Sequence, residues 1–328
     1  PLAAAGLLGV WGWPALFWCA VPLAIAVAWI AGPHLSRETV PVGERSEEHW
    51  GWLLWLVAGI FGLQYAIHEI PSEAASSRSL VFGVGIASII ALSVFAWRQW
   101  QKDKPLIDYR GLFQWRYLLG IALYFFGYFI AGTTGFLLPI LFSEGLGLSL
   151  TTTALVLSFS FFGSVAAALL HAAVASRRPR PRIFMLTGLA LYAIACLGFS
   201  QAGRLTDWHL LLLPALICGI AIPCFIGPVA FGTFVDLPPK VFSHGYQVKN
   251  IVRQLGISSS IALSTVALQF FYARRLAVLP EGFHPDWAQA LHGLSGANAG
   301  LVSPLTLASG DVFFLLALST LPMVLIVI

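Results

Sequence analysis

Long, continuous apolar runs recur along this chain, and short polar or basic stretches separate them. A helix needs about 20 apolar residues to cross a bilayer core. The runs do not alternate between apolar and polar residues, which favours helices over the strands of a membrane barrel. Nine full spans are expected, and residues 1–9 carry the end of a further one. The nine lie at residues 14–31, 51–69, 80–98, 116–142, 150–174, 183–201, 208–233, 250–272 and 311–328.

The composition agrees with this interpretation. Of the 328 residues, 58% are hydrophobic and 10% are charged, and the mean hydropathy is +0.84. A soluble domain carries about a quarter charged residues and could not bury this much apolar surface. We therefore expect an all-α, polytopic transmembrane helical bundle whose immediate surroundings are the lipid bilayer.

The basic residues are distributed unevenly between the connections. Fourteen of the 18 Lys and Arg lie in or beside every second connection. They are Arg37, Arg45, Arg98, Lys102, Lys104, Arg110, Arg116, Arg177, Arg178, Arg180, Arg182, Lys240, Lys249 and Arg253. The positive-inside rule then predicts that these loops lie in the cytoplasm. We expect a multi-pass protein of a bacterial inner (plasma) membrane. The net charge of +4 follows from this orientation, and we expect no nucleic-acid partner.

The candidate chemistry does not indicate an enzyme. The sequence contains no phosphate-binding glycine loop, nucleophile triad or paired catalytic carboxylates. All four cysteines lie in spans without metal-ligand or disulfide spacing, so they are expected to pack in the core. We expect no catalytic residues, no metal and no cofactor. The chain begins at Pro1 and ends at Ile328 within an apolar run, so we expect it to be incomplete at both ends.

Several stretches resemble the major facilitator superfamily, and specifically its fourteen-helix drug:proton antiporters of the EmrB/QacA type. Pro1–Gly9 and the following WGWPALFWCAVPLAI, residues 11–25, are similar to the end of that family's fifth helix and its turn into the sixth. KDKPLIDYRGLF, residues 102–113, resembles the segment before its ninth helix. Residues 245–263, GYQVKNIVRQLGISSSIAL, resemble the start of the family's thirteenth helix. Asp311–Phe313 resembles the D-x-F sequence that opens its fourteenth helix.

The resemblance implies a division of the chain. Residues 1–33 correspond to the end of an N-terminal bundle, with a partial helix 5 and helix 6. Residues 50–100 correspond to two extra central helices, and residues 116–328 form a C-terminal six-helix bundle. Residues 34–49 and 101–115 are then cytoplasmic linkers. The long outer connection at residues 276–310, in which a short helix is expected near residues 287–292, permits contact with a periplasmic adaptor.

The resemblance also implies a function. The expected activity is secondary active transport, with proton-coupled efflux of amphipathic drugs or other small molecules and with protons as the coupling ion. Two alternatives stay open: a metabolite or nutrient carrier of the same superfamily, and a membrane scaffold or accessory subunit that transports nothing.

The first candidate group lies on the 250–272 span. Asn250, Arg253 and Gln254 share one face, because residues three and four apart are neighbours on a helix. An Arg within a membrane span is costly unless it faces water, an acid or carbonyl groups. In the functional interpretation, Arg253 is an anchor that pairs with Asp236 or with a substrate. In the alternative, Arg253 lies one turn into the helix and its side chain snorkels to the cytoplasmic surface.

The remaining candidates lie on three other spans. Tyr124, Tyr128 and Thr133 would line a pocket for amphipathic, often cationic compounds through cation–π contact, or the rings would only pack against other aromatic residues. Ser160 and Ser164 would line the cavity or serve close helix packing. Pro223 belongs to a proline-rich span expected to be broken, as helices beside transport pathways often are.

Overall fold

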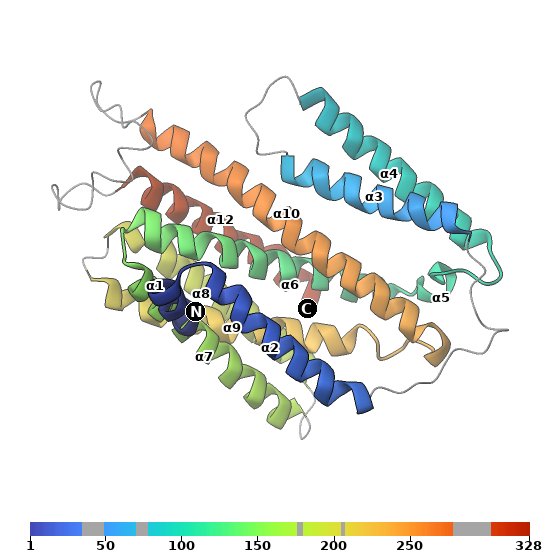
Figure 1. Ribbon diagram of the computed structural model, residues 1–328, viewed down its shortest axis with the longest axis horizontal. Helices are drawn as coiled ribbons and strands as arrows, with labels where there is room; N and C mark the ends of the chain where they lie inside the picture. Colours follow the sequence, from blue (N-terminus) through green and yellow to red (C-terminus); the bar gives the residue numbers. More distant parts are fainter. Residues whose placement is uncertain (35–48, 70–77, 176–179, 205–206, 278–302) are drawn as a thin grey trace.

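The chain folds into a bundle of helices that lie side by side (Figure 1). The computed structural model describes residues 1–34, 49–69, 78–175, 180–204, 207–277 and 303–328. Over these ranges it contains helices and no strands, and nine of the helices are long and apolar enough to cross a membrane. The expected all-α, polytopic bundle is confirmed.

The helices keep the order of the apolar runs. The helices are α1 (Leu2–Trp11), α2 (Pro14–Ala31), α3 (Trp50–Glu69), α4 (Arg78–Gln101), α5 (Tyr109–Leu112), α6 (Trp115–Ile140), α7 (Leu150–Ala175), α8 (Pro181–Ser200), α9 (Leu212–Gly232), α10 (Phe242–Leu276) and α12 (Pro304–Val327). Short helical turns cover Gly32–His34, Leu141–Gly145, Ala202–Arg204, Trp208–Leu211 and Pro239–Val241.

Two helices begin earlier than the hydrophobic pattern predicted. The expected 250–272 span is part of α10, whose 35 residues make a helix about 52 Å long, well beyond a hydrocarbon core of about 30 Å. Hydropathy marks only the part in lipid, so the polar first turns were missed. The expected 311–328 span begins at Pro304, where the Ser303 side chain caps the helix by accepting from the Leu305 amide.

The expected break in the 208–233 span does not occur. A 3₁₀ turn at Trp208–Leu211 leads into α9, which then continues through Pro223 and Pro228. Proline removes one backbone donor, and the carbonyl four residues earlier loses its helical partner. For Pro223 that carbonyl belongs to Gly219, and the Ser164 hydroxyl on α7 donates to it at 2.9 Å.

Glycines allow the helices of the main bundle to approach closely. A Cβ on Gly219 would overlap the carbonyl group of Ser160, so α7 and α9 touch backbone to backbone. A Cβ on Gly188 in α8 would lie 2.7 Å from the amide nitrogen of Phe225 in α9. Small residues at such crossings are typical of helix packing in membranes. The large core formed around α6, α8, α9 and α12 is therefore tightly packed.

Helices α3 and α4 form a hairpin that lies along one side of this bundle (Figure 1). The indole nitrogen of Trp55 on α3 donates to the carbonyl oxygen of Ala91 on α4 at 3.0 Å. The guanidinium carbon of Arg98 lies 4.1 Å from the centre of a Trp52 ring. The hairpin contacts the bundle through α3 and α10.

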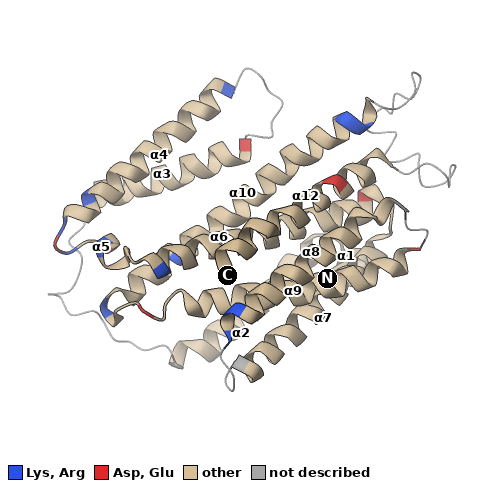
Figure 2. Cartoon of the chain, turned by 180° about the vertical axis from the view of Figure 1, so that it is seen from behind, with Lys and Arg blue, Asp and Glu red and all other residues tan. Residues whose placement is uncertain are grey.

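Lys and Arg gather toward one end of the helices (Figure 2). This end includes the last turn of α4, the start of α6 and the first turns of α10. Arg37, Arg45, Arg177 and Arg178 lie outside the described residues. So do most of the 34–49 linker and of the 276–310 connection, including the short helix expected near residues 287–292.

Candidate functional site

Helices α6 and α10 run next to each other, and their contact builds the candidate site (Figure 1). A Cβ on Gly256 of α10 would lie 2.8 Å from the carbonyl oxygen of Phe125 on α6, so the backbones meet here. Further along the same seam the Ser264 hydroxyl donates to the Thr133 hydroxyl oxygen at 3.2 Å. This close approach brings the polar face of α10 against the tyrosines of α6.

Lys249 of α10 lies among three aromatic rings. Its ammonium nitrogen is 5.0 Å from the ring centre of Tyr124, 5.1 Å from that of Tyr246 and 5.3 Å from that of Phe234. The electron-rich faces of aromatic rings attract cations at such distances, more strongly where water is scarce. Tyr124 belongs to α6, and Phe234 follows α9, so three separate segments hold this charge.

Arg253 lies one turn further along α10, above the next tyrosine of α6. Its guanidinium carbon is 5.9 Å from the ring centre of Tyr128, and the rings of Tyr124 and Tyr128 are 4.8 Å apart. We call Lys249, Arg253, Tyr124 and Tyr128 the two-cation cluster. Arg253 stands about 16 Å, or three turns, from the start of α10, and not one turn as the span bounds predicted.

The expected ion pair between Asp236 and Arg253 is not formed. The Asp236 carboxylate instead accepts from a guanidinium nitrogen of Arg116, at the start of α6, at 2.8 Å. Both side chains are about half exposed. This ion pair joins the segment after α9 to the beginning of α6. Arg253 instead contacts the ring of Tyr128.

Other predicted cavity residues lie where helices pack together. Thr133 is 1% exposed at the seam between α6 and α10. Ser160 and Ser164 face Gly219 at the crossing of α7 and α9, Ser160 through its backbone and Ser164 through its hydroxyl. Pro223 lies half-buried on α9, one turn beyond Gly219. The structure therefore places Thr133, Ser160 and Ser164 in helix–helix contacts, while Asn250 and Gln254 flank the two-cation cluster on α10.

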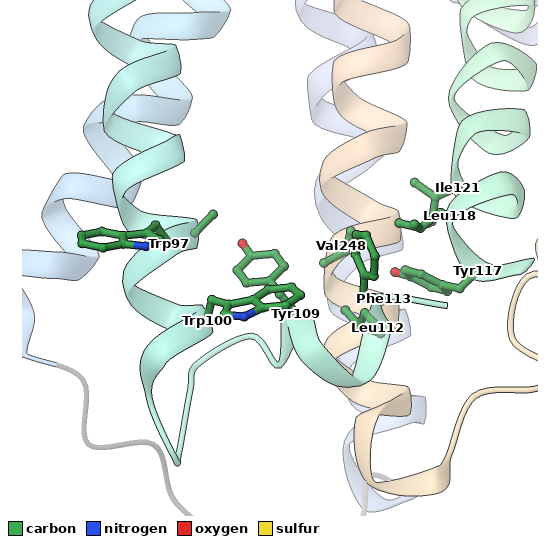
Figure 3. A pocket seen from close by; sticks show the side chains of 10 residues that line it. Trp97, Trp100, Tyr109, Leu112, Phe113, Tyr117, Leu118, Ile121 and Val248 are labelled. Atoms are coloured by element: carbon green, nitrogen blue, oxygen red, sulfur yellow. The ribbon is translucent and has the colours of Figure 1, made fainter. Parts of the chain in front are cut away.

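A separate pocket of about 580 Å³ lies between the α3–α4 hairpin and the seam of α6 and α10 (Figure 3). This volume is within the range of small-molecule sites. Aromatic side chains from three elements line it, with the Trp100 and Phe113 rings 5.8 Å apart. The lining residues are Ala96, Trp97, Trp100, Tyr109, Leu112, Phe113, Tyr117, Leu118, Ile121 and Val248. Burial raises the pKa of Tyr109, so its phenol stays neutral.

The 101–115 linker forms one wall of this pocket and is held in place by hydrogen bonds. The side-chain oxygen of Gln99, at the end of α4, accepts from the Leu106 amide at 2.7 Å. The Leu106 carbonyl oxygen lies 2.9 Å from Nδ1 of His244 on α10. The Asp108 side chain then caps the short helix α5 by accepting from the Gly111 amide. The linker is thus joined to α4 and to α10 at neighbouring points.

Lys249 was not predicted as a site residue, and the pocket was not predicted at all. Lys249 precedes Arg253 by four residues, so the helical period predicts that the two share one face of the helix. The contact of Lys249 with Phe234 could not be predicted in this way, because that ring comes from another segment. The pocket depends on how α4 approaches α6 and α10, and the only signal in the sequence was the number of aromatic residues on both sides of the linker.

Metal binding finds no support in the part of the chain that the structure describes, which holds no group of three or more His, Cys, Asp or Glu suited to a metal ion. Cys196, Cys218 and Cys224 are buried in the core, as expected for packing residues, and Cys19 is half-buried.

Comparison with known proteins gives a consistent result. Residues 1–261 match the family model described as Major Facilitator Superfamily. The chain is 23% identical over 261 residues to the lincomycin resistance protein of Listeria innocua, covering 78% of this chain and 54% of that protein. It is 23% identical over 299 residues to the multidrug resistance protein B homolog of Mycobacterium tuberculosis, covering 86% and 54%.

A shorter match joins the chain to the fatty acid resistance protein of Neisseria gonorrhoeae, at 25% identity over 148 residues, or 45% of this chain and 29% of that protein. The chain spans about half the length of the first two of these relatives.

Proposed function

The chain belongs to the Major Facilitator Superfamily, and from that premise we propose that it forms part of a secondary transporter that exports amphipathic compounds, driven by protons. The relatives named above for lincomycin resistance and multidrug resistance support export as the direction. The relatives' names range from lincomycin to fatty acids, so they leave the substrate class open.

The observation that carries this proposal is the two-cation cluster. Ionisable residues within membrane-spanning helices are rare because they are costly, and they usually mark a transport route. Lys249 and Arg253 stand on a helix of membrane-spanning length, against tyrosines of a second one. A site of this kind offers charge, hydrogen bonding and apolar surface to one molecule, as an amphipathic substrate requires.

The proposed mechanism is alternating access, in which two helical bundles rock about a central cavity. Helices α6, α9 and α10 would supply the C-terminal half of the cavity wall, with Tyr124, Tyr128, Asn250, Arg253 and Gln254 as its polar residues. The chain would be divided as its resemblance to the fourteen-helix antiporters implies: an end of the N-terminal bundle, an extra helix pair and a C-terminal bundle.

The proposed location is a bacterial inner membrane with the basic loops in the cytoplasm. The gathering of Lys and Arg toward one end of the helices supports this orientation through the positive-inside rule (Figure 2). On the opposite side the 276–310 connection would be free to meet a periplasmic adaptor. The coupling to protons is proposed from the same resemblance.

The test is drug accumulation in efflux-deficient cells that express the complete reading frame containing this chain. We expect lower accumulation of a panel of amphipathic drugs than in cells with an empty vector, and we expect a protonophore to abolish the difference. Arg253→Ala should also reduce the difference for part of the panel at equal membrane abundance. The matched control is Arg274→Ala at the other end of α10, which should leave export unchanged.

Accumulation equal to that of the empty vector across the panel, with the protein correctly inserted, would contradict export. A nutrient carrier or a scaffold would then be the better interpretation.

A further inference from the structure

The tyrosine faces that could attract a cationic compound already hold cations of the protein itself. Lys249 lies over Tyr124 and Arg253 lies over Tyr128. The sequence suggested that these rings bind cationic drugs. The structure instead presents two positive charges at the place where such a drug would have to lie.

These two charges have no acidic partner among the described residues. Asp236 pairs with Arg116, Asp311 with Arg275 and Asp207 with His209. Within the described ranges, no carboxylate lies within 4 Å of a side-chain nitrogen of Lys249 or Arg253.

The geometry of α10 keeps the two charges together. Residues four apart on a helix are neighbours on one face, and like charges at this spacing destabilise it. Charge that is not compensated is also costly near the membrane interior. An anion placed between an ammonium and a guanidinium removes both costs and forms charge-assisted hydrogen bonds. The site is therefore complementary to a negative group.

We propose that Lys249 and Arg253 bind the anionic group of an amphipathic substrate, and that the transporter selects amphipathic anions over cations of the same size. This inference rests on the proposed export function and adds the sign of the substrate charge. The guanidinium would pair with a carboxylate through two parallel hydrogen bonds, and the ammonium would add a point charge. The apolar part of the substrate would lie against the neighbouring rings.

Selection against cations follows from the same arrangement. A cationic amphipath of equal length would gain similar apolar contact, but it would meet two like charges and find the ring faces occupied. Specificity of this kind comes from a repulsive element as well as an attractive one. Removing the positive charges should therefore reduce the export of anions without reducing that of cations.

The experiment measures export from preloaded efflux-deficient cells that express the complete reading frame, with decanoate and decyltrimethylammonium as the anionic and cationic probes. We expect faster export of decanoate. Lys249→Gln and Arg253→Gln should each lower decanoate export about tenfold, the effect of losing one charged hydrogen bond. Lys249→Arg and Arg253→Lys, which keep the charge, should retain most of it. Lys240→Gln, outside the cluster, is the matched control.

Each result decides between the two proposals. Preferential export of decyltrimethylammonium, or of only the cationic members of the drug panel, would overturn the anion inference and keep the export function. An equal loss of both probes in the Gln variants would also overturn it, since the cations would then serve the transport cycle and not selection. Failure to export either probe or any panel drug would overturn export itself. The charge-keeping variants keep the test decisive if the Gln variants do not reach the membrane.

Discussion

The hydroxyl of Ser164 donates a hydrogen bond to the carbonyl oxygen of Gly219, across the contact between α7 and α9. This carbonyl is the one that Pro223 leaves without an amide partner in its own helix. In lipid, a backbone group without a partner costs several kcal/mol, so a neighbouring helix has to supply the missing donor. The serine thereby supplies the hydrogen-bond partner that Pro223 removes from the Gly219 carbonyl.

Ser164→Ala should destabilise the protein, and Pro223→Ala should remove that effect. A hydrogen bond between membrane helices contributes about 0.6 kcal/mol, and its loss here also leaves the Gly219 carbonyl unpaired. Alanine at residue 223 restores the amide that closes the helical hydrogen bond. A double-mutant cycle of thermal unfolding in detergent measures the coupling. Equal costs of Ser164→Ala in both backgrounds would contradict this account.

Gly219→Ala should separate α7 from α9, because the added methyl group would overlap the Ser160 carbonyl. Overpacking of this kind costs about 1–3 kcal/mol. Gly135→Ala is the matched control, since Gly135 is also within a long helix and a Cβ there meets nothing within 4 Å. Thermal unfolding of the two variants should differ clearly, and similar midpoints would argue against the close crossing.

Arg275 and Asp311 should stabilise the contact between α10 and α12 by a small amount. Their two hydrogen bonds of 2.9 and 2.7 Å form a bidentate pair. The side chains are 43% and 28% exposed, so screening limits the coupling to about 0.5–1 kcal/mol. A double-mutant cycle with alanine at both positions measures it, with Arg274→Ala as the control. Coupling that does not weaken in high salt would be inconsistent with a partly exposed pair.

The ends of the bundle should differ in their access to an impermeant thiol reagent. Asp103 and Glu144 are exposed in connections that the alternation of helices puts on opposite sides. Cys196, Cys218 and Cys224 are buried, so Cys19→Ser gives a parent with little background reactivity. In intact cells the maleimide should label Glu144→Cys, whereas Asp103→Cys should react only after lysis. The reverse pattern would invert the proposed orientation.

The sequence was sufficient to predict the helices but not all of their ends. Apolar runs report the length of chain in contact with lipid, and α2 and α7 follow them closely. The first turns of α10 contain Ser243, His244 and Gln247, which continue the helix outside the apolar region where hydropathy carries no signal.

The candidate site was predictable only in part. Tyr124, Tyr128 and Arg253 could be selected because they share faces of single helices, a property of local geometry. The ion-pair partner of Asp236 could not be predicted from the sequence. Arg253 is closer in sequence, yet the structure brings Arg116, 120 positions away, to the carboxylate. Ion pairs between helices depend on which helices pack together, and no periodicity within one helix carries that information.

The ties of the 101–115 linker have a mechanical consequence. Through Leu106, the last turn of α4 and the first turn of α10 are joined by two successive hydrogen bonds. His244 precedes Lys249 by five residues, or about 7.5 Å along a stiff helix. Only these two hydrogen bonds and this short length of helix separate the end of α4 from the charged end of the seam. A shift of α4 against the bundle would therefore be expected to move the end of α10 that carries Lys249.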